Sequence, residues 1–516
     1  MTALNKNKST ILFSLICLSV VLKIAILGSG LYTFPDEFRY VASQDAFEAI
    51  MHGDWQAAVK KMYAVDGRPA LVLLGLIPAA AQILTANFFM IPYNCQAIDY
   101  ILYGYNLLIF LFILRLLYVI GLKTGLQKEQ SLLAVLIYAC GVNAWLYIRH
   151  AFPYDTALLM VLFTIIYLIN NADRMHIRHA AFTGFLLALS FALYPGFYVL
   201  IAAVVLVYAW IAYSRQAFLK LSAVAGFTGL LVLAFFEILA KVAGTSYLLQ
   251  ATELSGTIVF GDFADTLLFP AKYLWKADYV IGIIVLIGSF IALIQFGKSV
   301  SNRSWKNQLQ QNLPVLFSVS AMLALFAFML QGPILGKMVF YGRTFHQFYP
   351  FMVLLFCWWL FKQPKLDKPA VLYGIAGLAL LTNLYVAVQY RKVDYPRNFS
   401  KHVNAHFTGY KKVVYESEMK IPGKTMSVPH DCFPYLPVET QTPFCADTAK
   451  TLVLVNNCYM WLPDIGTVKQ EYRGGGKVIY RKPHFTCFYP YLFEGAEIVN
   501  REMYEKSGFE MIAIEK

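Results

Sequence analysis

Residues 11–30 read ILFSLICLSVVLKIAILGSG, and residues 32–42, YTFPDEFRYVA, follow almost directly. The first stretch stays apolar for about twenty residues, the length that an α-helix needs to cross a bilayer. The second stretch places two adjacent carboxylates, Asp36 and Glu37, where such a helix would leave the membrane. The expected fold is therefore a membrane protein with an acidic pair at its surface.

The composition of the whole chain agrees with this start. Of the 516 residues, 59% are hydrophobic and only 14% are charged, whereas about a quarter of a soluble domain is charged. We predict a polytopic α-helical membrane protein whose first helix follows a basic NKNK segment and is not cleaved, because no clean small-x-small site follows it. Much of the net charge of +13 lies in short loops, as expected for loops on the cytoplasmic side. No basic-aromatic nucleic-acid module is seen, so no nucleic-acid partner is expected.

Apolar runs recur along the first 390 residues. If the basic loops face the cytoplasm, the number of crossings is odd, and 11 or 13 transmembrane helices both remain open. This orientation needs one net crossing between residues 70 and 120, but two spans can be drawn there. Either one of the two is re-entrant or interfacial, or the region contains a third crossing. The spans are expected near 11–31, 70–88, 98–120, 131–148, 153–170, 180–195, 197–213, 221–241, 277–297, 314–330, 347–361 and 369–390.

The chain divides into two expected domains. Residues 1–390 form the transmembrane domain, with a long outer loop at 33–69, and residues 391–516 form a soluble domain on the extracytoplasmic side. The stretches KKVVYE, TLVLV, KVIY and FEMIAIE are typical of strands, and IPGK and RGGGK are typical of turns. We predict a mixed α/β fold for this domain.

Four cysteines lie in the expected outer domain: Cys432, Cys445, Cys458 and Cys487. An even number in an extracytoplasmic domain favours two disulfides, with three possible pairings. A zinc site is the alternative, but no CxxC spacing occurs among them.

The outer loop is expected to carry surface helices. From Phe38 to Ile50 the apolar residues recur at helical intervals with acidic residues opposite, and a second short helix is expected between Asp54 and the DGRP stretch. The acidic pair then lies in or near the first turn of a helix. It is either an N-terminal cap on a solvated face or a catalytic group, and the pattern alone leaves both open.

Cations and aromatic residues gather in the same expected outer segments. A carboxylate can take a proton from an acceptor hydroxyl, arginines can hold a leaving phosphate through bidentate hydrogen bonds, and aromatic rings can stack on sugars. The alternatives are anchoring to lipid headgroups for the cations and an interfacial belt for the aromatics. The cations are Arg39, Arg68, Arg149, His150, Lys272, Lys276, Lys337, Arg343 and His346, and the aromatics include Tyr32, Tyr154, Tyr194, Tyr273 and Tyr349.

Three further stretches complete a pattern with the acidic pair. They are GRPALVLLGLIPAA after the outer loop, YIRHAFPYDTALLMVLFTIIYLI at 147–169 and GRTFHQFYPFMVLLF at 342–356. Together they resemble the GT-C glycosyltransferases that use polyprenyl-phosphate sugars, nearest to the protein mannosyltransferase and aminoarabinose transferase type. Phe345 and Phe348 stand where Tyr and Pro are commoner in that family. MIR-like repeats and the WWDYG signature of oligosaccharyltransferases are absent, as are Walker A, GxGxxG and DxD motifs for a nucleotide donor.

The resemblance implies a GT-C-like fold and a transferase that moves a single sugar from a polyprenyl phosphate, with inversion by single displacement. Asp36 is the expected general base and Glu37 the next candidate, and the other acid would bind a divalent metal or orient the acceptor; no other cofactor is expected. Arg68, Arg149, Arg343 and Lys272 are expected to bind the donor phosphate. The expected substrate-binding residues are His150, Asp155, Tyr154, His346 and Lys276, with Lys272 and Lys276 on a long loop that could act as a lid.

The resemblance also sets the expected surroundings. The partners would be the lipid-linked donor, membrane lipid, and a glycolipid, polysaccharide or protein acceptor, in a bacterial inner membrane. The main alternative is a transporter or flippase of a lipid-linked anion, for which the candidates within the spans are Lys23, Arg115, Glu237 and Lys241. A polysaccharide polymerase is disfavoured because the late loop at 331–346 is short.

Overall fold

The structure is a computed structural model. It describes residues 3–27, 38–65, 67–91, 96–142, 144, 148, 153–259, 267–301, 312–335, 342–392, 402, 405–406, 412–417, 438–439, 451–456, 477–483 and 510–515. The expected base Asp36 and its neighbour Glu37 lie outside these residues, as do Arg149 and His150. Arg343 is described by its backbone only.

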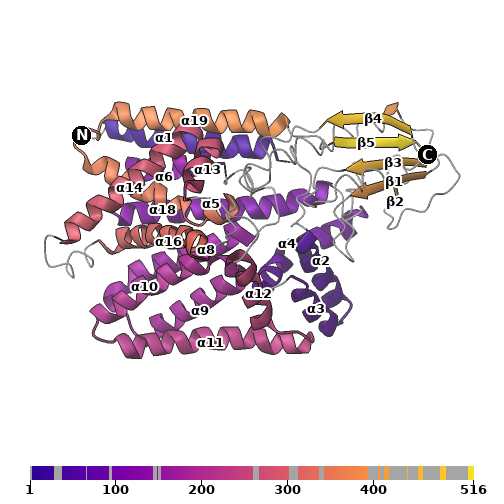
Figure 1. The fold of residues 1–516 in the computed structure, drawn as a ribbon, viewed down its shortest axis with the longest axis horizontal. Coiled ribbons are helices and arrows are strands. Elements are labelled where there is room, and N and C mark those ends of the chain that lie inside the picture. Colours follow the sequence, from indigo (N-terminus) through magenta and orange to yellow (C-terminus); the bar gives the residue numbers. More distant parts are fainter. Residues whose placement is uncertain are drawn as a thin grey trace.

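Helices make up most of the described chain (Figure 1). They are α1 (Ala3–Ala25), α2 (Phe38–Met51), α3 (Trp55–Met62), α4 (Pro69–Phe89), α5 (Gln96–Lys123), α6 (Lys128–Cys140), α8 (Pro153–Asn171), η2 (Ala172–Arg174), α9 (Ile177–Leu193), η3 (Pro195–Phe197), α10 (Tyr198–Ser214), α11 (Phe218–Val242), α12 (Tyr247–Val259), α13 (Phe269–Ala277), α14 (Tyr279–Ser301), α16 (Leu313–Leu335), α17 (Gly342–Phe345), α18 (Tyr349–Lys362) and α19 (Pro369–Lys392).

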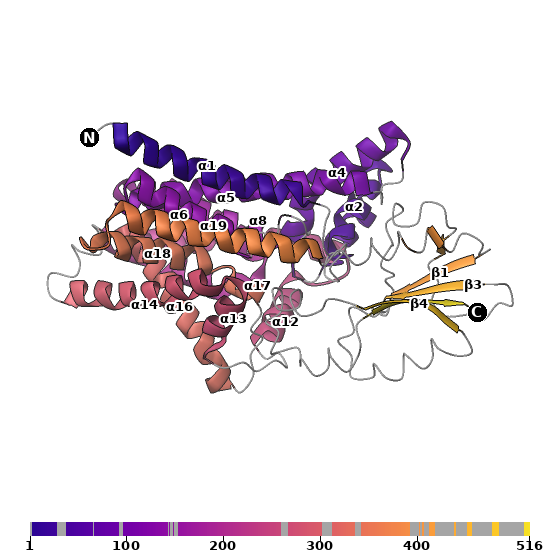
Figure 2. The same ribbon diagram turned by 90° about the horizontal axis from the view of Figure 1, so that it is seen from above.

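The long helices lie side by side in an elongated bundle with two distinct ends (Figures 1 and 2). One end holds the start of α1 and the turns 124–127, 215–217 and 363–368; we call it the N-terminal end. The other holds α2, α3 and the β-sheet; we call it the sheet end. In the described residues, nine helices are long and apolar enough to cross a membrane, and α9 and α18 are shorter apolar helices. This agrees with an integral membrane protein, and the choice between 11 and 13 crossings stays a prediction.

Close approach of backbones holds parts of the bundle together. A Cβ atom on Gly184 of α9 would lie 2.0 Å from the carbonyl oxygen of Ala225 on α11. No side chain fits into that space, so the two helices can pack only because glycine occupies this position. Small residues at such contacts let membrane helices gain packing energy where the hydrophobic effect between them is absent.

Two helices, α2 and α3, are found where the sequence predicted them in the outer loop, and their place at the membrane surface stays a prediction. Asp54 accepts a hydrogen bond from the Ala57 amide at 2.9 Å, which satisfies a free N–H group at the start of α3. Ala42 and Ala46 of α2 are buried, and the Ser43 hydroxyl donates to the Val72 carbonyl of α4. The loop therefore forms a helical layer against α4 at the sheet end.

The loop expected to carry Lys272 and Lys276, residues 261–279, contains the short helix α13, which has Pro270 in its first turn. Residues 261–266 lie outside the described part of the chain. Phe269, Tyr273 and Ala277 recur every four residues and are buried, so one face of α13 packs into the bundle. Helix α13 was not predicted, because a nine-residue helix is too short to give a clear periodic signal. The lid role stays a prediction.

Five strands form one mixed sheet: β1 (Lys412–Ser417), β2 (Val438–Glu439), β3 (Thr451–Asn456), β4 (Lys477–Pro483) and β5 (Glu510–Glu515). Their order is β2-β1-β3-β5-β4. β1 pairs in parallel with β2 and β3, whereas β5 is antiparallel to β3 and β4. The four strands predicted from the sequence are confirmed. The four tail cysteines lie outside the described residues, so their pairing stays a prediction.

Candidate functional site

Two residues from distant parts of the sequence meet at the centre of the candidate site. Asp155 lies in the first turn of α8, and His346 lies between α17 and α18. The Oδ1 atom of Asp155 and the Nε2 atom of His346 are 2.8 Å apart, and both side chains are buried. A hydrogen bond of this length in a water-poor place fixes the orientation of both groups.

The guanidinium group of Arg68 is connected to this region by contacts with two tyrosines, Tyr194 and Tyr154. Arg68 immediately precedes α4 and is 95% buried, with its Cζ atom 5.0 Å from the centre of the Tyr194 ring. The edge of Tyr194 meets Tyr154, at a centroid distance of 5.0 Å, and Tyr154 is the neighbour of Asp155 in the chain. Such a cation over an aromatic face is favourable and holds the guanidinium plane in place.

Buried tyrosines surround the histidine from the other side. The Tyr138 ring on α6 lies 6.2 Å from the His346 ring and 6.2 Å from the Tyr349 ring on α18. Among the residues that the structure describes, the Tyr138 hydroxyl and the second carboxylate oxygen of Asp155 are buried without a hydrogen-bond partner. Buried polar atoms of this kind need an explanation, and a bound polar molecule or a catalytic role would provide one.

Asp278 adds a second buried carboxylate near these tyrosines. It lies between α13 and the membrane span that begins at Tyr279, and its Oδ1 accepts a hydrogen bond from the Val142 amide at 2.8 Å. Burial raises the pKa of Asp278 to about 6, because the ionised form is poorly solvated there. The hydrogen bond from the Val142 amide favours the ionised form and lowers the pKa, but its effect is smaller.

Two glycines make room for the aromatic walls. A Cβ on Gly342 would lie 2.2 Å from the Tyr273 ring of α13, and a Cβ on Gly141 would lie 2.8 Å from the Tyr349 ring. Phe345, in the same short helix as Gly342, packs against Tyr273 at a centroid distance of 5.8 Å. Glycine is therefore required for α13 and α17 to close against the residues next to His346.

We call Arg68, Tyr138, Tyr154, Asp155, Tyr194, Asp278, His346 and Tyr349 the polar cluster. Four of the predicted site residues, Arg68, Tyr154, Asp155 and His346, belong to it. Lys272 and Lys276 lie on α13 and are half-buried, beside the buried Tyr273 that packs on Phe345. The acidic pair, Arg149, His150 and the Arg343 side chain cannot be placed, because they lie outside the described residues.

Sequence reasoning missed Tyr138 and Asp278. Tyr138 lies in a continuous apolar run, in which nothing marks one face as different from another. Asp278 had a usable signal, since an acid directly before a membrane span, in KADYVIGIIVL, is unusual. For metal binding, the described residues contain no group of three His, Cys, Asp or Glu side chains close enough to hold an ion. The acidic pair, where a metal was considered, is not among them.

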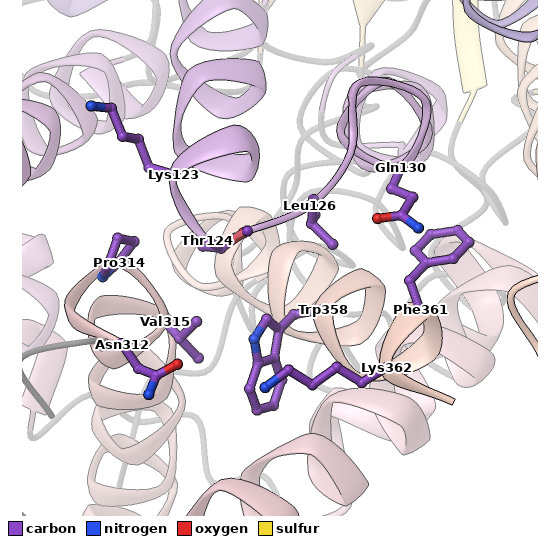
Figure 3. Close-up of a pocket in the computed structure, with 11 residues that line it drawn as sticks. Lys123, Thr124, Leu126, Gln130, Asn312, Pro314, Val315, Trp358, Phe361 and Lys362 are labelled. Atoms are coloured by element: carbon purple, nitrogen blue, oxygen red, sulfur yellow. The ribbon is translucent and has the colours of Figure 1, made fainter. Parts of the chain in front are cut away.

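A separate cavity of about 280 Å³ lies at the N-terminal end, away from the polar cluster (Figure 3). It is lined by residues of the α5–α6 turn, the start of α16 and the end of α18. Lys362 runs over the Trp358 ring, with its Nζ 4.0 Å from the ring centre, while Lys123 points away from Trp358. None of the predicted site residues lines it.

Comparison with known proteins gives partial similarities only. No protein-family model matches the chain, and no curated protein matches it. Among solved structures, the oligosaccharyltransferase of Archaeoglobus fulgidus, in complex with a tethered acceptor peptide, matches with a TM-score of 0.44 and 9% identity over 77% of this chain. The arabinofuranosyltransferase AftD from Mycobacteria matches with a TM-score of 0.42 and 12% identity over 87% of this chain.

The chain spans 57% and 36% of the length of those two proteins. Both are glycosyltransferases, the class of enzyme that the sequence resemblance implies. At these TM-scores the similarity assigns neither an activity nor a substrate, and the function proposed next depends on the residues of this chain.

Proposed function

We propose that this chain is an integral-membrane glycosyltransferase that moves one sugar from a polyprenyl phosphate to an acceptor hydroxyl. The observation that carries the proposal is the convergence of three sequence stretches in one buried cluster. GRP supplies Arg68, YIRHAFPYD supplies Tyr154 and Asp155, and GRTFHQFYP supplies His346. More than 270 residues of sequence separate the first of these stretches from the last.

The chemistry is a single displacement with inversion. The acceptor oxygen forms a bond to the anomeric carbon while the bond from that carbon to the phosphate oxygen breaks, and polyprenyl phosphate leaves with the electron pair. The acceptor proton passes to a carboxylate, for which Asp36 is proposed first and Glu37 second. Arg68, with Arg149, Arg343 and Lys272, would stabilise the charge that develops on the leaving phosphate.

The described cluster residues suit supporting roles in this reaction. The hydrogen bond between Asp155 and His346 fixes an imidazole that can contact a sugar hydroxyl, and Tyr154 lies beside the Arg68–Tyr194 pair. Aromatic faces and fixed polar groups of this kind are what a sugar site uses for orientation. His150 and Lys276 remain proposed contacts to the substrate. We also propose that the acidic pair could bind a divalent metal, whose protein ligands there would be the carboxylate oxygens of Asp36 and Glu37.

The distribution of charge supports an orientation. Basic residues in the described turns gather at the N-terminal end, which favours the cytoplasm for that end. The polar cluster and the β-sheet would then lie on the extracytoplasmic side. An enzyme that takes its sugar from a lipid-linked donor on that side needs no nucleotide-binding fold. The basic residues are Lys123, Lys128, Arg174, Arg178, Arg215, Lys220, Lys298, Lys362, Lys365 and Lys368.

A transporter is less well supported, because three of its four candidate residues, Lys23, Glu237 and Lys241, make local structural contacts. Lys23 of α1 is buried and donates to the Ala139 carbonyl of α6 at 2.5 Å and to Asn383 Oδ1 of α19 at 3.4 Å. Glu237 pairs with Lys241 at 3.2 Å and accepts a hydrogen bond from the Leu248 amide at 3.0 Å. The contacts of Lys23 join α1 to α6 and α19, and those of Glu237 join α11 to the start of α12.

The test of the proposal is an assay on the purified protein in liposomes. Several polyprenyl-phosphate sugars are added with a mixed acceptor extract, and released polyprenyl phosphate is measured by mass spectrometry. The proposal expects release with at least one donor and none from the nucleotide sugars used as controls. Passage of the intact lipid-linked sugar across the liposome without any release would support the transporter and contradict the proposal.

A further inference from the structure

An open groove of about 980 Å³ lies between α1, α5 and α6. These helices are neighbours in the bundle, and α1 runs along its edge (Figures 1 and 2). Phe13 and Val21 of α1 are 58% and 56% exposed, so the groove opens outward from the bundle. The residues that line it are Ser9, Thr10, Phe13, Ile16, Cys17, Val20, Val21, Leu111, Leu114, Arg115, Tyr118, Lys128, Glu129, Leu132 and Val135.

All three helices change from polar to apolar in the same direction along the groove. On α1, Ser9 and Thr10 are followed by apolar residues as far as Val21. On α6, Lys128 and Glu129 are followed by apolar positions, and on α5, which runs the opposite way, Arg115 follows the apolar residues. The polar side chains therefore gather toward the N-terminal end. The apolar part extends about 18 Å from there, at 1.5 Å per helical residue.

The polar end of the groove carries a positive excess. Arg115 is exposed although it lies two turns inside the apolar span 97–123, with its Cζ 5.8 Å from the Tyr118 ring. Glu129 is the acid in the lining, and its Oε1 accepts a hydrogen bond from Ser9 Oγ at 2.6 Å. Arg115 and Lys128 thus outnumber it. A charge within a span is costly and usually marks a place where a polar partner reaches it.

We propose that this groove binds one anionic phospholipid. The phosphate contacts Arg115 and Lys128 at the polar end, and one acyl chain lies along Phe13, Ile16 and Val20. Basic pockets between membrane helices on the cytoplasmic side select anionic headgroups in this way. The polyprenyl-phosphate donor is not the occupant, because the polar cluster is at the opposite end of the bundle. The lipid site follows from the groove itself, and only the exclusion of the donor and the assignment to the cytoplasmic side rest on the proposed function.

The test measures lipid retention by the full-length protein. The protein is first delipidated, and then phosphatidylglycerol or phosphatidylcholine with identical acyl chains is titrated in. Native mass spectrometry counts the molecules of each lipid that bind to the protein. We expect wild type to retain one phosphatidylglycerol in preference to phosphatidylcholine. Each basic residue near a membrane surface favours anionic lipid about fivefold, so Arg115→Gln combined with Lys128→Gln should lower the preference roughly 25-fold.

Matched variants separate this site from general charge effects. Lys365→Gln with Lys368→Gln removes two exposed charges from the same end of the bundle, outside the groove, and should keep the preference. Cys17→Trp places an indole in the apolar part and should lower the retention of both lipids. It also tests the proposal if the double glutamine variant does not fold. Equal retention by wild type, the groove variants and the control would overturn the proposal, and so would displacement of phosphatidylglycerol by equimolar polyprenyl phosphate.

Discussion

At the scale of single residues, the hydrogen bond between Asp155 and His346 joins two helix starts that are 191 residues apart in sequence. Both side chains are buried, so bulk water does not replace this hydrogen bond when it is lost. Substituting one of them removes the contact in a place that water does not reach. The effect of a substitution should therefore depend on whether the new side chain can still accept a hydrogen bond.

Asp155→Ala should lower the free energy of unfolding by about 1–3 kcal/mol, since the buried hydrogen bond to His346 Nε2 is lost. Asp155→Asn should cost less, because the amide oxygen can accept the same hydrogen bond. Thermal unfolding in detergent, followed by tryptophan fluorescence, compares the two with wild type. If Asp155→Ala and Asp155→Asn unfolded at the same temperature as wild type, the hydrogen bond would have no structural role.

Asp278 predicts a pH dependence with a definite sign. Its pKa is raised to about 6 in the folded protein, above the value of about 3.9 in an unfolded chain, so folding favours the protonated form. The stabilising contribution is complete below about pH 4 and is lost as the pH rises through 6. Asp278→Asn removes the titration, so the difference in stability between pH 4.5 and 7 should be smaller in the variant. An unchanged difference in thermal unfolding would contradict the raised pKa.

At the scale of helices and strands, the sequence predicted what depends on regular patterns. The apolar spans are marked by their length: nine of the twelve expected spans are long enough to cross a membrane, and α9 and α18 are shorter apolar helices. The span expected at 131–148 is described as the shorter helix α6, Lys128–Cys140, with most of the residues after 142 outside the described part. Helices α2 and α3 and the four longer strands are present where the sequence predicted them. The short helices α12 and α13 were missed, because nine to thirteen residues between two turns can be apolar on one face by chance. The contact of Lys23 with Asn383 was also beyond prediction, since 360 residues separate them.

The same reasoning explains which site residues could be found. Arg68, Asp155 and His346 were predicted to lie near one another because each stands where a loop enters a span, and such entries gather on one side of a membrane. Tyr138 was missed because it stands inside a span, where the sequence does not tell which neighbour a side chain faces. Burial on all sides removes the periodicity that would reveal it.

Packing between α13 and α17 can be tested with a single methyl group. Gly342→Ala places a Cβ about where the Tyr273 ring lies, so the ring or the helix must move. Overpacking of this kind typically costs about 1–3 kcal/mol. Gly374→Ala on α19 is the matched control, because nothing lies within 4 Å of the new atom, and it should be neutral or stabilising. Equal melting temperatures for both variants would show that α13 does not close against α17.

At the scale of the whole molecule, the proposed orientation puts the sheet end outside the cytoplasm. This predicts that Cys432, Cys445, Cys458 and Cys487 form two disulfides, because extracytoplasmic compartments are oxidising. Alkylation of the unreduced protein followed by mass spectrometry reports each thiol, and the buried Cys140 and Cys357 serve as free-thiol references after denaturation. Four alkylated tail cysteines would contradict both the disulfides and the assigned orientation.

We propose that one acid of the pair Asp36 and Glu37 is the base for sugar transfer, and a rate measurement distinguishes this role from that of a helix cap. Release of polyprenyl phosphate is timed for wild type, Asp36→Asn, Glu37→Gln and the double variant, with donor binding and expression measured in parallel. Loss of a general base lowers the rate by about 10²–10⁴, whereas Asn caps a helix about as well as Asp. We predict that Asp36→Asn loses transfer and keeps donor binding; loss in Glu37→Gln alone would move the base by one residue. Wild-type rates in both single variants and in the double variant would contradict the claim.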